Sequence, residues 1–340
     1  MRVKLRLYSS FSLVIILLLM FVLSAFNYSN PDYENYNLLF ESVQNKGVGF
    51  ITSQIGLVWL MKFASFGGSG YHFVLSIIFF IGLLILVSTF ELSNYQRLLF
   101  LSLYIIYPFF LDLIQIKHFM SMCLFVLAIH WLYYGNTKLS LLALIAGSFF
   151  HYVALYFVPF VIVYKMNIKW TKFLFLSLLV LLVNILFVQT GMVQKILTII
   201  FGLRIQAYLD GQVRGVFFVY LIYFMSVFSL VLFVSIGKMR NLKLKRLFDL
   251  VFYLNVFAVQ TIPFCMMNIS FFRIYRFVLV VNVFYILSAL VSHSLSNRII
   301  VFLAMFSLNL VMFYFTFGAS FDTTVYSIFK NNLLWDVLRP

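Results

Sequence analysis

Long apolar runs separated by short polar stretches dominate the chain from Phe11 to Phe317. Most runs approach the roughly 20 apolar residues that a helix needs to cross a bilayer. Each run is expected to be helical, because lipid offers backbone N–H and C=O groups no other partners. The sequence therefore predicts one integral membrane domain, an all-α polytopic transmembrane helical bundle of about 10–11 membrane segments. The runs lie near residues 11–26, 50–66, 72–90, 98–114, 118–134, 139–164, 173–190, 214–236, 247–268, 274–292 and 299–317.

The composition agrees with this architecture and excludes a soluble protein. The chain has 340 residues, of which 64% are hydrophobic and only 10% are charged, and its mean hydropathy is +1.06. A water-soluble core cannot absorb that much apolar surface. No polar stretch is long enough for a soluble catalytic domain, so any chemistry lies in short loops and between helices.

The distribution of charge predicts the topology. The formal net charge is +15, from 24 Lys and Arg against 9 Asp and Glu. Many basic residues gather in segments 2–6, 165–172 and 238–246, none of which contains an acid. Such segments stay cytoplasmic, which explains the charge better than nucleic-acid binding does. The N-terminus is therefore predicted to be cytoplasmic. The predicted extracytoplasmic segments are 27–49, 191–213 and 318–340.

Two segments leave an alternative topology open. Residues 50–66 carry polar side chains, and they could lie in the outer interface rather than cross. Residues 139–164 are long for one helix and short for two, so they could form a re-entrant segment with His151 at its tip. Both changes together would place Lys117 and His151 on the outer side, beside 27–49. We favour this version.

The first predicted outer loop contains an acidic and aromatic cluster, Asn30–Tyr36. Pro31 suits the first position of a helix, and Asp32 and Glu34 then fall in the first turn, where the dipole favours anions. Tyr36 follows Asp32 by four residues, so the two share a face. A carboxylate beside an aromatic ring suits a sugar hydroxyl, and the alternative is a capped interfacial helix with ordinary belt tyrosines. Asp32 and Glu34 are also a conceivable pair of ligands for a divalent ion, but two acids alone are a weak metal signal.

Lys117 and His151 each interrupt an apolar run. Lys117 is either a lysine that snorkels to an interface or a cation that faces an anionic head group. Ionisable groups inside membranes usually face a cavity or the bundle interior. An imidazole there suits general base catalysis on an acceptor hydroxyl, and the alternative for His151 is a packing role.

Arg273 and Arg276 lie one helical turn apart and share a face. Guanidinium groups match the geometry of phosphate, so the pair is a candidate diphosphate site, and the alternative is interfacial anchoring. The two cysteines lie in apolar runs and indicate neither a disulfide nor a metal site. Further candidate polar side chains in the predicted outer segments are Arg204, Tyr208, Arg214 and Tyr326.

The order and spacing of several short motifs resemble the EpsG/Wzy-type polysaccharide polymerases of capsule and exopolysaccharide clusters. The resemblance extends over nearly the whole chain. One departure is a lysine at position 117, where the family often has an arginine. The stretches that carry the resemblance are Asp32–Glu41, Gly49–Phe63, Gln115–Met122, Phe149–Leu155, Tyr208–Leu209, Phe272–Phe277 and Val325–Phe329.

The resemblance implies a glycosyltransferase at the outer face of the bacterial plasma membrane. It would polymerise undecaprenyl-diphosphate-linked oligosaccharide repeat units, with undecaprenyl diphosphate as the leaving group. No metal and no cofactor are expected, because the lipid diphosphate is already activated. The expected partners are the lipid-linked oligosaccharides and the bilayer. A chain-length regulator and a flippase of the same pathway are candidate partners, and nucleic acid is not expected.

In this interpretation the candidate residues converge on one site. Asp32 or His151 would act on the acceptor hydroxyl. Lys117, Arg273 and Arg276 would bind the diphosphate, where preorganised cations stabilise developing charge. The residues expected to contact the glycan are Glu34, Tyr36, Arg204, Tyr208, Arg214 and Tyr326.

Two other functions remain open from the sequence. One is a membrane glycosyltransferase that uses a polyprenyl-phosphate sugar, with a metal at Asp32 and Glu34 that chelators would remove. The other is a non-enzymatic flippase for the same lipid-linked repeat, which would have related halves and a cationic cavity. No such halves are visible in the sequence.

Overall fold

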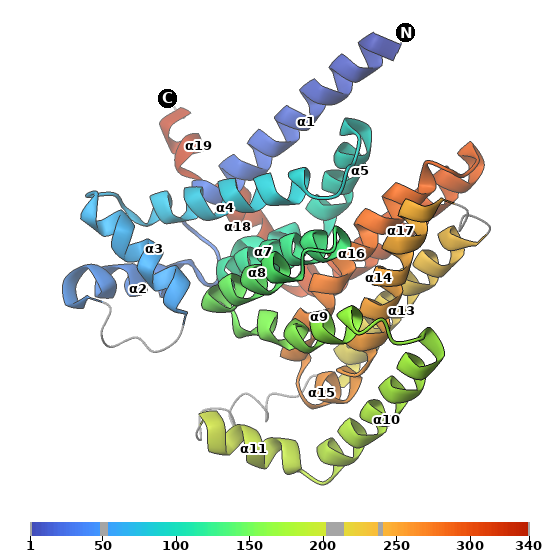
Figure 1. Cartoon of the computed structure of the whole chain (residues 1–340). Coiled ribbons are helices and arrows are strands. Elements are labelled where there is room, and N and C mark those ends of the chain that lie inside the picture. The colour runs from blue at the N-terminus through green and yellow to red at the C-terminus, as the bar shows by residue number, and fades with distance from the viewer. Residues whose placement is uncertain (1, 48–53, 202–213, 237–240, 339–340) are drawn as a thin grey trace. The chain divides into compact units, whose positions relative to one another are not determined.

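The computed structural model describes residues 2–47, 54–201, 214–236 and 241–338, and its regular elements in these ranges are helices (Figure 1). Within them, seven helices are long and apolar enough to cross a membrane, and four shorter apolar helices accompany them. Each of the seven coincides with a predicted run. The prediction of an all-α polytopic membrane protein is therefore confirmed. The seven cover residues 71–88, 94–114, 116–133, 170–189, 217–235, 270–290 and 295–320.

The chain forms two compact units, of which the first comprises Met1–Val158 and Leu303–Pro340. Helix α7 lies at its centre, with α4 and α8 packed against it (Figure 1). Gly82 of α4 approaches α7 so closely that an added Cβ would lie 2.4 Å from the ring of Phe119. This close packing fixes α7, which carries the candidate site. The first helices of the unit are α1 (Arg2–Ala25), α2 (Tyr33–Lys46), α3 (Ile55–Phe66), α4 (Tyr71–Ser88), α5 (Asn94–Tyr104), α6 (Phe110–Ile114), α7 (Ile116–Tyr133) and α8 (Thr137–Phe150).

The predicted run 98–114 is interrupted rather than continuous. Tyr107, with φ −161° and ψ 128°, and Pro108 have non-helical backbone angles. Proline has no N–H to donate and its ring clashes with the preceding turn. The interruption leaves α6 as a short separate helix, which holds Asp112 directly before α7.

The predicted run 139–164 divides at His151, as the favoured topology requires. Helix α8 ends at Phe150, the 3-10 helix η2 (Tyr152–Phe157) follows, and α9 (Val158–Lys165) continues. At 1.5 Å per residue, neither apolar arm reaches the roughly 30 Å of the hydrocarbon core. Helix α3, with 12 residues, is also too short to cross alone.

The C-terminal tail packs on the junction between α1 and α2. After α17 (Leu295–Phe317), the tail forms short helices that include α18 (Ser327–Lys330) and α19 (Leu333–Leu338). The side chain of Asn27 donates to the carbonyls of Ile328 and Asn331 at 3.2 and 3.1 Å. The tail and the junction therefore lie on the same side of the membrane. The predicted topology requires this, because it places both segments outside the cytoplasm.

Replacing Asn27 with Ala is expected to destabilise the protein by about 2 kcal/mol, because Asn27 is fully buried and two carbonyls would lose their donor. Thermal unfolding of the purified protein in detergent micelles measures the effect. Asn35→Ala, on the exposed face of α2, is the matched control and should leave the midpoint unchanged. Equal midpoints for Asn27→Ala and the natural protein would contradict the assigned role of the tail contact.

The second unit comprises Pro159–Phe302 and is built around α16, against which α13 and α14 pack. Asn255 of α14 and Asn282 of α16 exchange two amide hydrogen bonds, of 2.7 and 2.8 Å, and both side chains are fully buried. These bonds fix the register of the two helices. The helices of the unit include α10 (Trp170–Gln189), α11 (Met192–Phe201), α13 (Arg214–Ser235), α14 (Leu242–Val259), α15 (Ile262–Met267) and α16 (Arg273–Leu290).

Two predicted boundaries in this unit differ from the structure. The run 247–268 is split between α14 and α15, since Pro263 begins a new helix more readily than it continues one. Most of the first half of the predicted loop 191–213 is the helix α11, whose residues 196–201 are apolar except for Thr198.

Candidate functional site

Two consecutive side chains at the start of α7 point to different neighbours, because successive residues of a helix are about 100° apart. The ammonium of Lys117 lies 5.9 Å from the ring centroid of Tyr36 on α2, within cation–π range. His118 lies on a different face of α7, toward Asp112 of α6 and His151 at the end of α8. The structure thus brings Lys117 and Tyr36 together, two residues that the sequence singled out separately.

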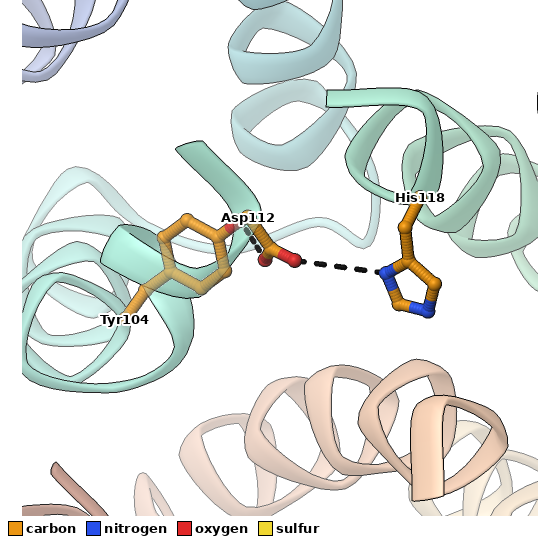
Figure 2. Close-up of polar contacts among 3 residues, drawn as sticks. All are labelled: Tyr104, Asp112 and His118. Carbon is orange, nitrogen blue, oxygen red and sulfur yellow. Dashed lines mark hydrogen bonds and ion pairs between the residues drawn. The ribbon is translucent and has the colours of Figure 1, made fainter. Parts of the chain in front are cut away.

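Asp112 is buried, and Tyr104 and His118 lie against its carboxylate (Figure 2). The hydroxyl of Tyr104 donates to Asp112 Oδ2 at 2.7 Å, and His118 Nδ1 lies 3.7 Å from Asp112 Oδ1. Asp112 and His118 are 0% and 1% exposed. A carboxylate buried this deeply is tolerated only when neighbouring groups compensate its charge and donate hydrogen bonds to its oxygens.

His151 completes this cluster. The rings of His118 and His151 meet edge to face, with centroids 5.5 Å apart at 80°. The backbone N–H of Val153 donates to His151 Nδ1 at 3.3 Å, and Ser121 Oγ donates to the His151 carbonyl at 3.2 Å. Since Nδ1 accepts a hydrogen bond, the neutral ring carries its hydrogen on Nε2. His151 is therefore positioned as a donor through Nε2 rather than as a base.

Helix α2 presents the acidic and aromatic cluster. It begins at Tyr33, two residues later than Pro31 predicts, so Asp32 is its N-cap and Glu34 lies exposed in its first turn. The half-buried Asp32 side chain makes no capping hydrogen bond in the described structure. Tyr36 is buried. The carboxylate of Asp32 is thus not committed to holding the helix end.

Tyr33 and His72 hold α2 in place. Tyr33 Oη and His72 Nε2 are 3.1 Å apart, and His72 Nδ1 lies 2.9 Å from the carbonyl of Ala25. The Nδ1 atom can only donate to that carbonyl, so Nε2 accepts from the tyrosine. Burial raises the pKa of Tyr33, which keeps the phenol protonated as the donor. His72 therefore links α1, α2 and α4, which is a structural role.

Arg273 and Arg276 belong to the second unit, at the start of α16. Arg273 is half-buried and Arg276 is 1% exposed. They lie in the first turn, which is fully described and contains no acidic residue. Two cations at the positive end of a helix favour an anion there.

The other sequence candidates are placed as follows. Tyr326 is exposed in the tail of the first unit, at the end of the π-helix Asp322–Tyr326. Arg204 and Tyr208 lie outside the described residues, and for Arg214 only its position as the first residue of α13 is described. In the part of the chain that the structure describes, no three His, Cys, Asp or Glu side chains are grouped to hold a metal ion.

Sequence reasoning missed Asp112. The signal was present, because Asp112 is an ionisable residue within the predicted membrane run 98–114, and such residues are usually functional or structurally essential. Its pairing with His118 was not predictable from spacing, because the interruption at Pro108 sets the direction of α6.

The comparisons with known proteins agree with the resemblance of the short motifs. The family model described as the EpsG family matches residues 10–329, nearly the whole chain. No curated protein and no solved structure matches this chain. The chain therefore belongs to the EpsG family, a Wzy-type polymerase-like family.

Proposed function

We propose that this protein polymerises undecaprenyl-diphosphate-linked oligosaccharide repeat units into capsular polysaccharide or exopolysaccharide at the outer face of the bacterial plasma membrane. Membership of the EpsG family carries the proposal, since the family indicates an exopolysaccharide polymerase-like role. The cluster of polar side chains at the start of α7 supports it, because buried ionisable groups in a membrane protein usually serve function. The flippase and chain-length regulator of the same pathway are the proposed partners.

The proposed reaction is a metal-independent glycosyl transfer. A hydroxyl oxygen of the new lipid-linked repeat forms a bond to the anomeric carbon of the growing glycan. The bond from that carbon to the diphosphate oxygen breaks, and its electron pair leaves with undecaprenyl diphosphate. The hydroxyl proton passes to a base, so the enzyme must supply a proton acceptor and stabilise the departing charge.

Asp32 is the better of the two candidate bases. Its carboxylate is half-buried at the start of α2, where it makes no capping bond in the described structure, so it can accept a proton. His151 Nδ1 instead accepts from Val153, which leaves the ring as a donor that can orient an acceptor or donor sugar oxygen. We assign the base to Asp32 and the orienting contact to His151.

Lys117 and the arginine pair are the proposed diphosphate ligands. Lys117 lies in the first turn of α7, where its ammonium and the positive end of the helix dipole act together on an anion. Arg273 and Arg276 combine charge and helix end in the same way in the second unit. Their joint action with Lys117 on one substrate stays a prediction.

Aromatic and polar side chains are proposed to hold the sugars. The ring of Tyr36 lies next to Lys117, and Tyr33, on the same helix, forms an aromatic cluster with Tyr71 and His72. Sugar faces stack on such rings, and carboxylates accept from sugar hydroxyls. The other proposed glycan contacts, assigned from the sequence and the family resemblance, are Glu34, Arg204, Tyr208, Arg214 and Tyr326.

The direct test reconstitutes the purified full chain in liposomes with lipid-linked repeat units and follows chain length on gels. Glycans longer than one repeat, formed also in the presence of a metal chelator, would support the proposal. Repeats that move across the bilayer without becoming longer would identify a flippase instead. Loss of extension on chelation would identify a metal-dependent transferase.

Replacing Lys117 with Gln is expected to lower kcat about ten- to hundredfold, because a hydrogen bond to the charged diphosphate is lost. Lys117→Arg should keep most activity, since it preserves the cation and adds a second donor. Initial rates in the liposome assay measure both. Lys138→Gln, which removes an exposed lysine from the start of α8, is the matched control. Equal rates for Lys117→Gln and this control would contradict the role of Lys117.

A further inference from the structure

A cavity of about 650 Å³ lies in the second unit, where the loop between α9 and α10 meets the start of α14. None of the residues proposed for glycosyl transfer lines this cavity. Its volume lies within the range of about 300–1,000 Å³ that is usual for sites of small ligands. Its lining includes Lys169, Trp170, Lys245, Asp249 and Tyr253.

The loop that forms one wall is held by specific contacts. Asn167 has a φ of 49°, a left-handed conformation that asparagine tolerates better than most residues, and it turns the chain after α9. The hydroxyl of Tyr253 donates to the carbonyl of Ile168 at 2.7 Å. The ring of Tyr253 also lies 4.7 Å from that of Phe173 and 6.0 Å from that of Tyr164. These contacts hold the loop in place beside α14, so the walls of the cavity are fixed by the fold.

The charges around the cavity favour an anion. Lys169 and Lys245 line it from opposite segments and are both exposed, against one acidic lining residue, Asp249. Lys169 immediately precedes α10, and its side chain, which can only donate, cannot cap the first N–H groups of that helix. Two ammonium groups and the positive end of α10 together match a phosphate group.

The surroundings of the cavity favour a lipid as the source of that phosphate. Helix α10 is one of the long apolar helices, and it leaves most of its large apolar side chains exposed along its length. Trp170, at its first position, is 60% exposed, as is typical of tryptophans at a membrane interface. A head group in the cavity would leave its acyl chains against α10, a contact that a soluble phosphate cannot make.

We propose that this cavity binds the phosphate-bearing head group of an anionic phospholipid. Lys169 and Lys245 contact the phosphate, the ring of Trp170 lies at the level of the glycerol backbone, and α10 contacts the acyl chains. The lining shares no residue with the proposed polymerase site, so the lipid-binding proposal does not rest on glycosyl transfer. The basic loops nearby are predicted to be cytoplasmic, which assigns the lipid to the inner leaflet.

The test measures lipid binding to the purified full chain in detergent micelles by native mass spectrometry, during titration with phosphatidylglycerol. The double variant Lys169→Gln, Lys245→Gln is expected to bind phosphatidylglycerol about tenfold more weakly. The matched control is Lys172→Gln, Lys243→Gln, which removes the same charge from exposed positions of α10 and α14 outside the cavity lining. The control should bind as the natural protein does, and phosphatidylcholine should bind weakly to all three.

Three results would overturn the proposal. If both double variants bind phosphatidylglycerol equally weakly, the attraction is a diffuse one to surface charge. If neither variant binds it more weakly than the natural protein, Lys169 and Lys245 do not contact the lipid. Displacement of the lipid by millimolar inorganic phosphate would assign the cavity to a soluble anion. Size-exclusion elution confirms that each variant is folded, which is expected because all four lysines are exposed.

Discussion

Replacing Asp32 with Asn is expected to lower kcat for chain extension by about 10²- to 10⁴-fold, the usual contribution of a general base. The amide has the same shape as the carboxylate but cannot take the proton of the acceptor hydroxyl. Asparagine is as good an N-cap as aspartate, so α2 should begin at the same place and the fold should be retained. Initial rates with purified protein and lipid-linked repeats, at saturating substrate, give the ratio.

Two further variants make the Asp32 result specific. Asp322→Asn removes an exposed acid from the tail of the same unit and should leave the rate unchanged. Asp32→Glu keeps a proton acceptor at a slightly different position and should recover part of the rate. A fully active Asp32→Asn protein would assign the base to another residue, and the family membership would stand unaffected.

The second large effect is expected on stability, at Asp112. Asp112→Ala should destabilise the folded protein by about 3 kcal/mol, because Tyr104 and His118 would lose the buried group that they share. The side chains lie in the interior of the first unit, where water cannot replace the lost partner. Unfolding of the purified protein in mixed micelles measures the loss.

A double-mutant cycle separates the tyrosine bond from the rest of this effect. Tyr104→Phe removes only the hydroxyl that donates to Asp112 at 2.7 Å. The combined variant should be less destabilised than the sum of the two single variants, by about 1–2 kcal/mol. Strict additivity would mean that the two side chains do not interact, contrary to the structure.

The membrane helices were predictable from the sequence because lipid permits few alternatives. A run such as 72–90 has no other way to satisfy its backbone, and the structure places α4 at Tyr71–Ser88. Breaks within the runs were harder. The division at His151 was visible in the length of 139–164, whereas the splits at Pro108 and before Pro263 depend on how each short segment packs.

The sequence predicted several residues of the candidate site, but it did not predict which of their side chains contact one another. Lys117 and His151 stand out as polar residues in apolar runs, but their sequence positions carry no information about which helices pack together. The contact of Lys117 with Tyr36 depends on the packing of α2 near α7, and that of His118 with His151 depends on α8. Such contacts between distant parts of the chain follow from tertiary packing, which periodicity does not encode.

The discontinuity of the first unit has a consequence for synthesis. The second unit is continuous in sequence, whereas the first needs Leu303–Pro340 to complete it. Domains generally fold in the order in which the ribosome delivers them. Here the helices before Val158 must wait for Leu303–Pro340, which is synthesised after the second unit, so the first unit matures after the second. A chain released after Phe302, without Leu303–Pro340, should therefore contain a folded second unit and a protease-sensitive first unit.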